Sequence, residues 1–260
     1  TISRRQRQMC IRDRAIASPG GPEDFVAGLC GMTVGQWQRR GKYLMAALEP
    51  EGGVWGVHLR MTGQFQWHEQ PSEPCKHTRV RFWNSKEHEL RFVDVRSFGE
   101  MWWVPPGQPM EEVITGLTRL GPEPFSTDFS ASYLKQKLKG SSRPIKTALL
   151  DQALVAGAGN IYADESLFAS GIAPFTPAGQ LNLRQLERLR DALVNVLTIS
   201  IGAGGTTFSD FRDLEGVNGN YGGQAWVYRR GGEPCRSCGT PIQREKLSGR
   251  STHWCPTCQS

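Results

Sequence analysis

The sequence predicts an α+β multidomain protein with a strand-rich N-terminal part, a helical part and a short cysteine-bearing module at the C-terminus. Residues 41–105 are rich in β-branched and aromatic side chains, whereas helical spacing dominates after residue 125. Four of the seven cysteines lie within the last 26 residues. A chain of 260 residues is long enough for one large domain or two modest ones, each with its own core.

The N-terminal part contains several stretches that are typical of β-strands. Gly, Asn-Ser and Pro-Ser separate them, and these residues are common in the turns between strands. We therefore expect a β-sandwich or a barrel-like domain. The stretches are VWGVHLRMTGQFQW from Val54, TRVRFW from Thr78, HELRFVDV from His88 and MWWVP from Met101.

The helical part begins after LGPEPF at residues 120–125. The spacing of apolar residues predicts helices over residues 130–138, 145–154, 162–170 and 183–201. A Gly- and Asn-rich segment then follows up to residue 223. A segment of this length indicates either a functional mobile loop or disorder. We expect three domains, at residues 1–120, 121–224 and 225–260.

The net charge of +6 favours a polyanionic partner, because clustered Lys and Arg gain free energy by displacing counterions from phosphates. However, the first fourteen residues, TISRRQRQMCIRDR, hold five arginines and one aspartate and so supply +4 of that charge. The distribution of charge, and not its total, must therefore identify the partner.

The chain has no run of about eighteen apolar residues and its opening has no hydrophobic signal core, so we expect neither a membrane span nor a secretory signal. An Arg-rich organelle targeting peptide stays open as an alternative for the opening. We expect a cytoplasmic protein that acts as a monomer. The scattered positions of the other three cysteines agree with a reducing compartment.

The strongest single motif is a pair of CxxC knuckles, Cys235 with Cys238 and Cys255 with Cys258. Sixteen residues lie between Cys238 and Cys255. Each knuckle presents two thiolates, and a hairpin of this length brings the pairs together around one tetrahedral ion. The sequence thus predicts one structural Zn²⁺ in a zinc ribbon. Two disulfides or four free thiols are the alternative. Arg250 lies in the turn of the expected hairpin, where it is either a phosphate contact or a solvated surface arginine.

A second motif is a helix, a tight turn and a helix within IKTALLDQALVAGAGNIYADESLFASGIAP. Gly157 and Gly159 allow a close approach of the backbone to a ligand, and we expect Asn160 to cap a helix that starts at Ile161. The amides at such a helix start form an anion site, although a capped helix that packs its own core is the alternative. The preceding stretch is basic, with Lys135, Lys137, Lys139, Arg143 and Lys146.

Three further positions lie in the strand-rich part. Lys42 in RRGKYL lies between two strand-like stretches, and Met61 follows in HLRMTG; a solvated strand end and a packing methionine are the ordinary interpretations. Arg96 and Phe98 in VDVRSFG are two residues apart, so their side chains project to the same side of an extended segment. A basic and an aromatic side chain placed in this way can open a base stack.

In their order and spacing, these segments resemble the formamidopyrimidine-DNA glycosylase family. RRGKYL, HLRMTG, DVRSFG, LGPEPF, GAGNIYADESLFASGIAP, GGTT and the four-cysteine ribbon carry the resemblance, which runs from about Arg12 to the C-terminus. It implies an N-terminal β-sandwich, a helix-two-turns-helix domain and a zinc finger, with duplex DNA in the cleft between them. It also implies excision of oxidised purines, such as 8-oxoguanine and formamidopyrimidines, from a base flipped out of the duplex, followed by β,δ-elimination at the abasic site.

The resemblance also implies roles for particular residues. Lys42 would assist β-elimination and Arg250 would assist δ-elimination, while a mobile loop over residues 211–223 would close over the flipped base. Met61, Arg96 and Phe98 would fill the vacated space in the duplex. The implied phosphate contacts are His77, Arg143, Lys146 and Asn160.

The sequence departs from the family pattern at three places. Ser97 stands where the family's DPRRFG has an arginine, and Ser142 stands where some members have a lysine, with Arg143 beside it as a substitute. The family begins with Pro-Glu-Leu-Pro-Glu, whose proline amine is the nucleophile, and the quoted chain has no such stretch. We interpret TISRRQRQMCIRDR as a truncated or mis-assembled front end.

Three alternatives stay open. The first is an endonuclease VIII-like glycosylase for oxidised pyrimidines, although HLRMTG and LGPEPF favour the branch of the family that acts on purines. The second is a damaged-DNA-binding protein without catalysis, because the Pro-Glu terminus is not in the quoted chain. The third is a zinc-ribbon module for protein contacts, which would leave the basic stretch before Lys146 without a purpose.

Overall fold

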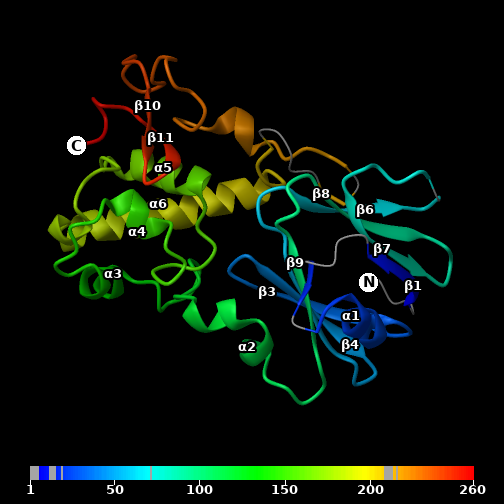
Figure 1. The fold of residues 1–260 in the computed structure, drawn as a ribbon. Helices are drawn as coiled ribbons and strands as arrows, with labels where there is room; N and C mark the ends of the chain where they lie inside the picture. Colours follow the sequence, from blue (N-terminus) through cyan, green and yellow to red (C-terminus); the bar gives the residue numbers. More distant parts are fainter. Residues whose placement is uncertain (1–5, 12–15, 19, 71, 208–212, 215) are drawn as a thin grey trace. The chain divides into compact units, whose positions relative to one another are not determined.

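The computed structural model of the chain describes residues 6–11, 16–18, 20–70, 72–207, 213–214 and 216–260 (Figure 1). The chain divides into two compact units. The first comprises residues 1–118 and 207–219, and the second comprises residues 119–206 and 220–260. The three-domain division at residues 120 and 224 stays a prediction.

The first unit is a β-sandwich, which confirms that part of the predicted fold. One sheet has the strand order β2-β9-β5-β4-β3, and the other has the order β1-β7-β8-β6. All pairs are antiparallel except β2 with β9. The elements are β1 (Gln6–Ile11), β2 (Ala17–Ser18), α1 (Pro22–Leu29), β3 (Thr33–Arg40), β4 (Tyr43–Glu49), β5 (Gly53–His58), β6 (Gly63–His68), β7 (Thr78–Asn84), β8 (Glu89–Asp94), β9 (Glu100–Val104) and α2 (Met110–Val113).

The alternation of side chains explains why these residues form a sandwich. In β7 every second residue from Thr78 to Asn84 is buried, as expected for a strand with one face on a core. Trp55 of β5 packs on Phe82 of β7 with ring centroids 4.8 Å apart, so side chains of the two sheets share one core. Truncating a buried aromatic residue such as Trp55 would cost about 3–5 kcal/mol.

The second unit combines helices with the cysteine hairpin. Its helical core is built from leucine and alanine side chains that recur at helical spacing, such as Leu186, Leu189 and Leu193. The elements are α3 (Ala131–Lys137), α4 (Ile145–Leu149), α5 (Asn160–Ser170), α6 (Leu183–Gly202), the 3-10 turns η2 (Thr115–Arg119), η3 (Ala178–Gln180) and η4 (Tyr221–Gln224), and the strands β10 (Gln243–Leu247) and β11 (Arg250–Trp254). Of these, η2 spans the boundary between the units.

The ends of the helices follow local chemistry. Ser130 caps α3 through the amide of Tyr133, and Asn182 and Gln185 form a capping box at the start of α6. The prediction that one helix covers residues 145–154 was wrong, because α4 ends at Leu149. There the Asp151 carboxylate accepts a hydrogen bond from the amide of Ala153, which favours a turn over a further helical turn.

The hairpin of β10 and β11 lies against α5 (Figure 1). Leu247 pairs with Arg250 across a two-residue loop, and both loop residues, Ser248 and Gly249, have positive φ. This is the pattern of a type I′ turn, whose twist matches that of the flanking strands. Arg250 is thus the first residue of β11, directly after the turn.

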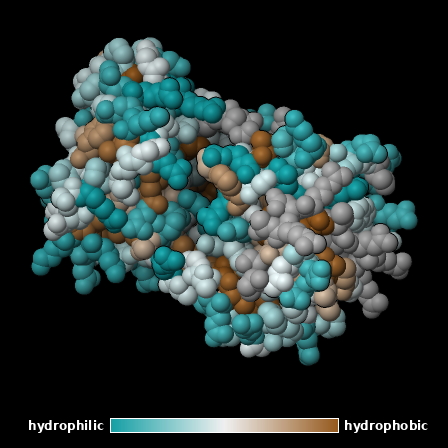
Figure 2. Space-filling model, viewed as in Figure 1, coloured by the Kyte–Doolittle hydropathy of each residue, from teal (hydrophilic) through white to brown (hydrophobic). Residues whose placement is uncertain are grey.

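Most of the face seen in Figure 2 is hydrophilic, with hydrophobic residues scattered between hydrophilic ones. Apolar side chains of the helices are instead gathered in the helical core. Within the described ranges, no helix combines the length and the apolar character that a membrane crossing requires.

Candidate DNA-binding site and zinc centre

Met61 and Phe98 lie on two loops of the first unit. Met61 is in the turn between β5 and β6, and Phe98 is in the loop between β8 and β9. The two residues are 57% and 50% exposed, although both are apolar. Exposed apolar residues mark an interaction surface only where they lie together, so the contacts between these two loops decide the question.

Arg96 joins the two loops. Its Nη1 lies 3.0 Å from the Sδ of Met61, and its guanidinium carbon lies 4.7 Å from the centre of the Phe98 ring. The second contact is a cation–π interaction. The structure therefore brings together the three residues predicted to enter the duplex.

The buried carboxylate of Asp94 bonds to the backbone of the loop that carries Arg96 and Phe98. Asp94 accepts hydrogen bonds from the amides of Arg96 (3.2 Å), Phe98 (2.8 Å) and Gly99 (2.7 Å), and from the hydroxyl of Thr62. Burial alone would raise the pKa of Asp94, but these hydrogen bonds outweigh it and hold the pKa below its ordinary value. Asp94 is therefore a permanent anion at neutral pH.

Lys42 lies in the two-residue turn between β3 and β4, after Gly41, which has a positive φ of 57°. The Lys42 side chain is exposed. Nearby, burial and the charges of Arg60 and Lys42 lower the pKa of His58 to about 4. His58 is thus neutral at pH 7, and its Nδ1 accepts a hydrogen bond from the amide of Arg60 at 3.0 Å.

His77 lies in the turn that leads into β7 and is half-buried. Its carbonyl oxygen accepts a hydrogen bond of 2.9 Å from the amide of Asp94. This bond links the turn to the end of β8, where the loop with Arg96 and Phe98 begins.

In the second unit, Lys146 is buried, although sequence analysis predicted a phosphate contact there. Its ammonium lies 2.6 Å from Asp164 and donates to the Ser251 carbonyl at 2.6 Å and to the Thr252 hydroxyl at 2.9 Å. All three partners belong to the protein. The side chain therefore joins α4 to α5 and to β11 of the cysteine hairpin.

Asn160 contacts Ser251, the residue that follows Arg250 in β11. The Asn160 Nδ2 donates to the carbonyl oxygen of Ser251 at 3.0 Å. The prediction that Asn160 caps the helix was wrong, because α5 starts at Asn160 itself, after Gly159, and no side chain caps it. Asn160 instead reaches the hairpin, where the neighbouring Arg250 is exposed.

Arg143 precedes α4 and pairs with Asp151 at 2.9 Å. Both side chains are about two-fifths exposed, so the guanidinium can also reach an external anion. The loop predicted to close over a flipped base covers residues 211–223, of which 211, 212 and 215 lie outside the described residues.

The four cysteines of the ribbon converge. The sulfur atoms of Cys235, Cys238, Cys255 and Cys258 all lie within 4.8 Å of one another. Tetrahedral Zn²⁺ with Zn–S bonds of about 2.3 Å requires sulfurs about 3.8 Å apart, so this donor set fits the ion. Four thiolates leave no open coordination position, and the zinc site is therefore structural.

Sequence analysis missed two acidic residues in α5. Asp164, besides its contact with Lys146, accepts from the amide and the Nδ1 of His253 at 3.0 and 3.1 Å. The carboxylate of Glu165 accepts from the consecutive amides of Trp226, Val227 and Tyr228 at 2.8–2.9 Å. The signal was two adjacent acids within an otherwise apolar helix, IYADESLF, where a solvated pair is not expected.

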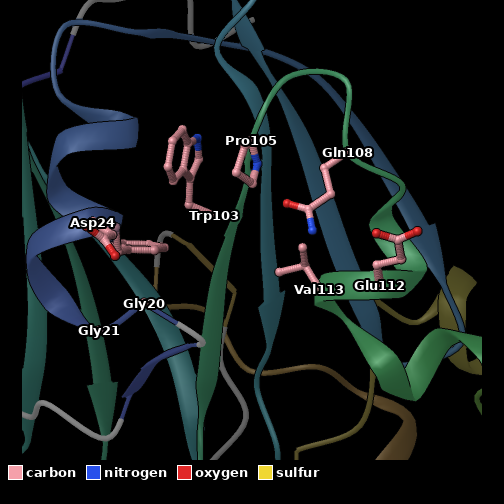
Figure 3. A pocket seen from close by; sticks show the side chains of 9 residues that line it. Gly20, Gly21, Asp24, Trp103, Pro105, Gln108, Glu112 and Val113 are labelled. Carbon is pink, nitrogen blue, oxygen red and sulfur yellow. The ribbon is translucent and has the colours of Figure 1, made fainter.

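A small pocket of about 190 Å³ lies elsewhere in the first unit (Figure 3). Trp103 and Pro105 line one part of it, while Gln108 and Glu112 reach it from the segment that ends in α2. Asp24 lines the part that belongs to α1. None of the predicted site residues lies in this pocket, so it is not part of the candidate site.

A β-sandwich, a helical segment with a tight Gly-rich turn and a four-cysteine finger together define a helix-two-turns-helix protein of the zinc-finger type. Three family models match in this order along the chain. The Formamidopyrimidine-DNA glycosylase N-terminal domain matches residues 2–101, its H2TH domain matches residues 120–212, and the zinc finger found in FPG and IleRS matches residues 232–260. The chain belongs to the formamidopyrimidine-DNA glycosylase family. The match begins well before Arg12, where the resemblance was expected to start.

Individual relatives agree with this assignment. A formamidopyrimidine-DNA glycosylase of Parasynechococcus marenigrum is 77% identical over 98% of this chain and 91% of its own length. The crystal structure of Fpg (MutM) from Thermus thermophilus is 40% identical with a TM-score of 0.87, covering 99% of this chain and 92% of that one. The Lactococcus lactis Fpg in complex with Fapy-dG DNA is 31% identical with a TM-score of 0.90, covering 100% and 94%.

Proposed function

We propose that the chain is a DNA base-excision repair enzyme. It excises oxidised purines, 8-oxoguanine and formamidopyrimidines, from duplex DNA and cleaves the backbone at the resulting abasic site by β,δ-elimination. The observation that carries this proposal is the identity of 77% with a formamidopyrimidine-DNA glycosylase over nearly the whole chain.

The solved complexes of a related protein support the substrate class. The Lactococcus lactis Fpg has been crystallised with DNA that contains Fapy-dG and with DNA that contains an abasic site. These two DNAs correspond to the substrate of the first step and to its product. A base must leave the stack before its glycosidic carbon can be attacked, so side chains that fill the vacated space are part of the reaction.

For the base-excision step, Met61, Arg96 and Phe98 are our candidates for that filling. The contacts of Arg96 to Met61 and to the Phe98 ring support this role, because they place three exposed side chains in one group. Lys42, exposed in its hairpin turn, is our candidate for a role in β-elimination.

For DNA binding, His77, Arg143 and Asn160 are our candidates for phosphate contacts, and Arg250 is our candidate for δ-elimination. The exposed guanidinium of Arg250 beside the Asn160–Ser251 bond supports a shared anion site at the hairpin. For Lys146 we propose a positioning role, since its ammonium already has three protein partners. We further propose that the protein acts as a monomer in the bacterial cytoplasm.

Covalent trapping tests the proposal directly. An amine nucleophile forms a Schiff base with the sugar, and borohydride reduces that adduct to a stable bond between protein and DNA. We expect a covalent adduct with a duplex that contains 8-oxoguanine when the chain is made with Pro-Glu-Leu-Pro-Glu at its start, ahead of the sequence that resembles the family. The same version with Ala in place of the first Pro is the matched control.

Three results would redirect the proposal. Equal trapping by the 260-residue chain as printed would contradict an N-terminal proline as nucleophile. Release of oxidised pyrimidines but not of 8-oxoguanine would favour the endonuclease VIII-like alternative. Tight binding of damaged duplex without trapping by either version would favour a damage-binding protein.

A further inference from the structure

We infer that Asp94 and Thr62 are positioning residues that join the loop of Met61 and the loop of Arg96 and Phe98 into one preassembled unit. The inference rests on the proposed function, because it assigns these loops to the opening of the base stack. Asp94 and Thr62 are not among the side chains proposed to enter the duplex. They hold the backbone of the loops that carry those side chains.

The carboxylate of Asp94 is saturated by four donors. Its Oδ1 accepts from the Thr62 hydroxyl and from the amide of Arg96 at 3.2 Å, and its Oδ2 accepts from the amides of Phe98 at 2.8 Å and Gly99 at 2.7 Å. The side chain is fully buried. Hydrogen bonds to a buried charged group are among the stronger ones, so this carboxylate fixes the course of residues 96–99.

The loop needs such fixing because its backbone is unfavourable on its own. Ser97 has a positive φ of 55°, a conformation that residues other than Gly, Asn and Asp rarely adopt. At Gly99 a side chain has no room, since an added Cβ would lie 2.5 Å from the Phe92 ring. The loop therefore depends on Asp94 to hold Arg96 and Phe98 at the surface.

Thr62 connects the second loop to the same anchor. Its hydroxyl donates to Asp94 and accepts from the amide of Arg96 at 3.1 Å, while Met61, the preceding residue, touches the Arg96 side chain at 3.0 Å. The two loops are thus linked twice, once through the half-buried Thr62 hydroxyl and once through the exposed Met61 side chain.

Preassembly has a specific consequence for DNA. Side chains that are already held in the arrangement they take in the duplex lose less conformational freedom on entry. The benefit is largest where a stacked base must be displaced, and it is smallest where the duplex already has a gap, because the unstacking cost is then low. Loss of the anchor should therefore weaken binding to a base-containing site more than binding to an abasic site.

Two variants test this consequence. Thr62→Val removes the hydroxyl and keeps the shape of the side chain. Asp94→Asn keeps one oxygen for the amides of Phe98 and Gly99 but turns an NH₂ group toward the amide of Arg96, which can only donate. Thr118→Val is the matched control, because the Thr118 hydroxyl donates to the carbonyl of Thr115 within its own 3-10 turn.

The measurement is the Kd of each variant for two duplexes that differ only at one position, which holds either 8-oxoguanine or a tetrahydrofuran abasic analogue. Thr62→Val removes the hydrogen bond to Asp94 and the one from the amide of Arg96, and we expect it to weaken binding to the 8-oxoguanine duplex roughly three- to tenfold. Binding to the abasic duplex should stay within about twofold, as should both values for Thr118→Val.

Equal losses on the two duplexes, or no loss on either, would overturn the positioning role. If Asp94→Asn does not fold, Thr62→Val still decides the question. If the unaltered chain binds neither damaged duplex more tightly than undamaged DNA, the proposed function fails, and this result is distinct from a failure of the inference.

Discussion

The ammonium of Lys146 lies 2.6 Å from the carboxylate of Asp164, and neither side chain is more than 1% exposed. The pair connects α4 with α5, and hydrogen bonds from Lys146 to Ser251 and Thr252 extend it to β11. Burial lowers the pKa of Lys146, while the nearby charge of Asp164 opposes that effect. Both charges are thus removed from water, and each is the counter-charge of the other.

Removing one member of this pair should destabilise the protein strongly. We expect Asp164→Asn and Lys146→Met each to lower the free energy of unfolding by about 3–5 kcal/mol, because the remaining charge stays buried without its counter-charge. Urea unfolding of the zinc-loaded protein measures the change. Asp191→Asn is the control, since its pair with Arg190 is exposed and should contribute about 0–1 kcal/mol. A loss below 1 kcal/mol at Asp164 would show that the pair is not needed for stability.

The role of Arg250 should appear in the salt dependence of DNA binding. Each phosphate that a cationic side chain neutralises steepens the fall of affinity with salt. We expect Arg250→Ala to reduce the magnitude of the slope of log Kobs against log salt by about 1, measured on a nonspecific duplex. Arg244→Ala tests a second exposed arginine of the same hairpin and should leave the slope unchanged. Equal slopes for wild type and Arg250→Ala would exclude a phosphate contact.

The sequence predicted those features that depend on short spacings. Alternating burial in β7 and the two CxxC knuckles are local patterns, and the structure confirms a sandwich and a convergent cysteine cluster. The burial of Lys146 was not predictable in this way, because its partners Ser251 and Thr252 are 105 and 106 residues away along the chain. A lysine in a basic stretch looks solvated until the packing of a distant hairpin is known.

Asn160 shows a second limit of sequence reasoning. An Asn after a Gly-rich turn is a good helix cap by local preference, but its amide here bonds to Ser251 of the hairpin instead. A tertiary contact thus replaced the local one. Asp94 differs, because three of its four donors come from the DVRSFG stretch itself and the fourth, Thr62, lies 32 residues away along the chain.

Zinc should be required for the finger and hence for DNA binding. The finger has a small core, with Val227 and Ile242 packed around the buried cysteines, so it has little apolar burial of its own. We expect Cys238→Ser to reduce the zinc content from one ion per chain and to weaken duplex binding at least tenfold. Cys75→Ser, which changes a cysteine outside the cluster, should keep the metal. Full zinc content in Cys238→Ser would contradict the four-thiolate site.

The acid stability of the sandwich should depend on Glu89. This buried carboxylate pairs with Arg91 at 2.8 Å and with Arg81. Burial by itself would raise its pKa, but hydrogen bonds and charges from the two arginines outweigh it and lower the pKa from 4.5 to about 2. Because the unfolded chain holds the proton more tightly, the contribution of Glu89 is complete above about pH 4.5 and is lost as the pH falls toward 2.

The difference between the two pKa values corresponds to a contribution on the order of 3 kcal/mol. We therefore expect Glu89→Gln to be less stable than wild type at pH 7 and to lose less further stability between pH 5 and pH 2.5 in urea unfolding. The control Glu100→Gln removes the exposed pair with Arg60 and should follow the wild-type curve within about 1 kcal/mol. Parallel pH curves for Glu89→Gln and wild type would show that this carboxylate does not govern acid unfolding, since its protonation is the step that the variant removes.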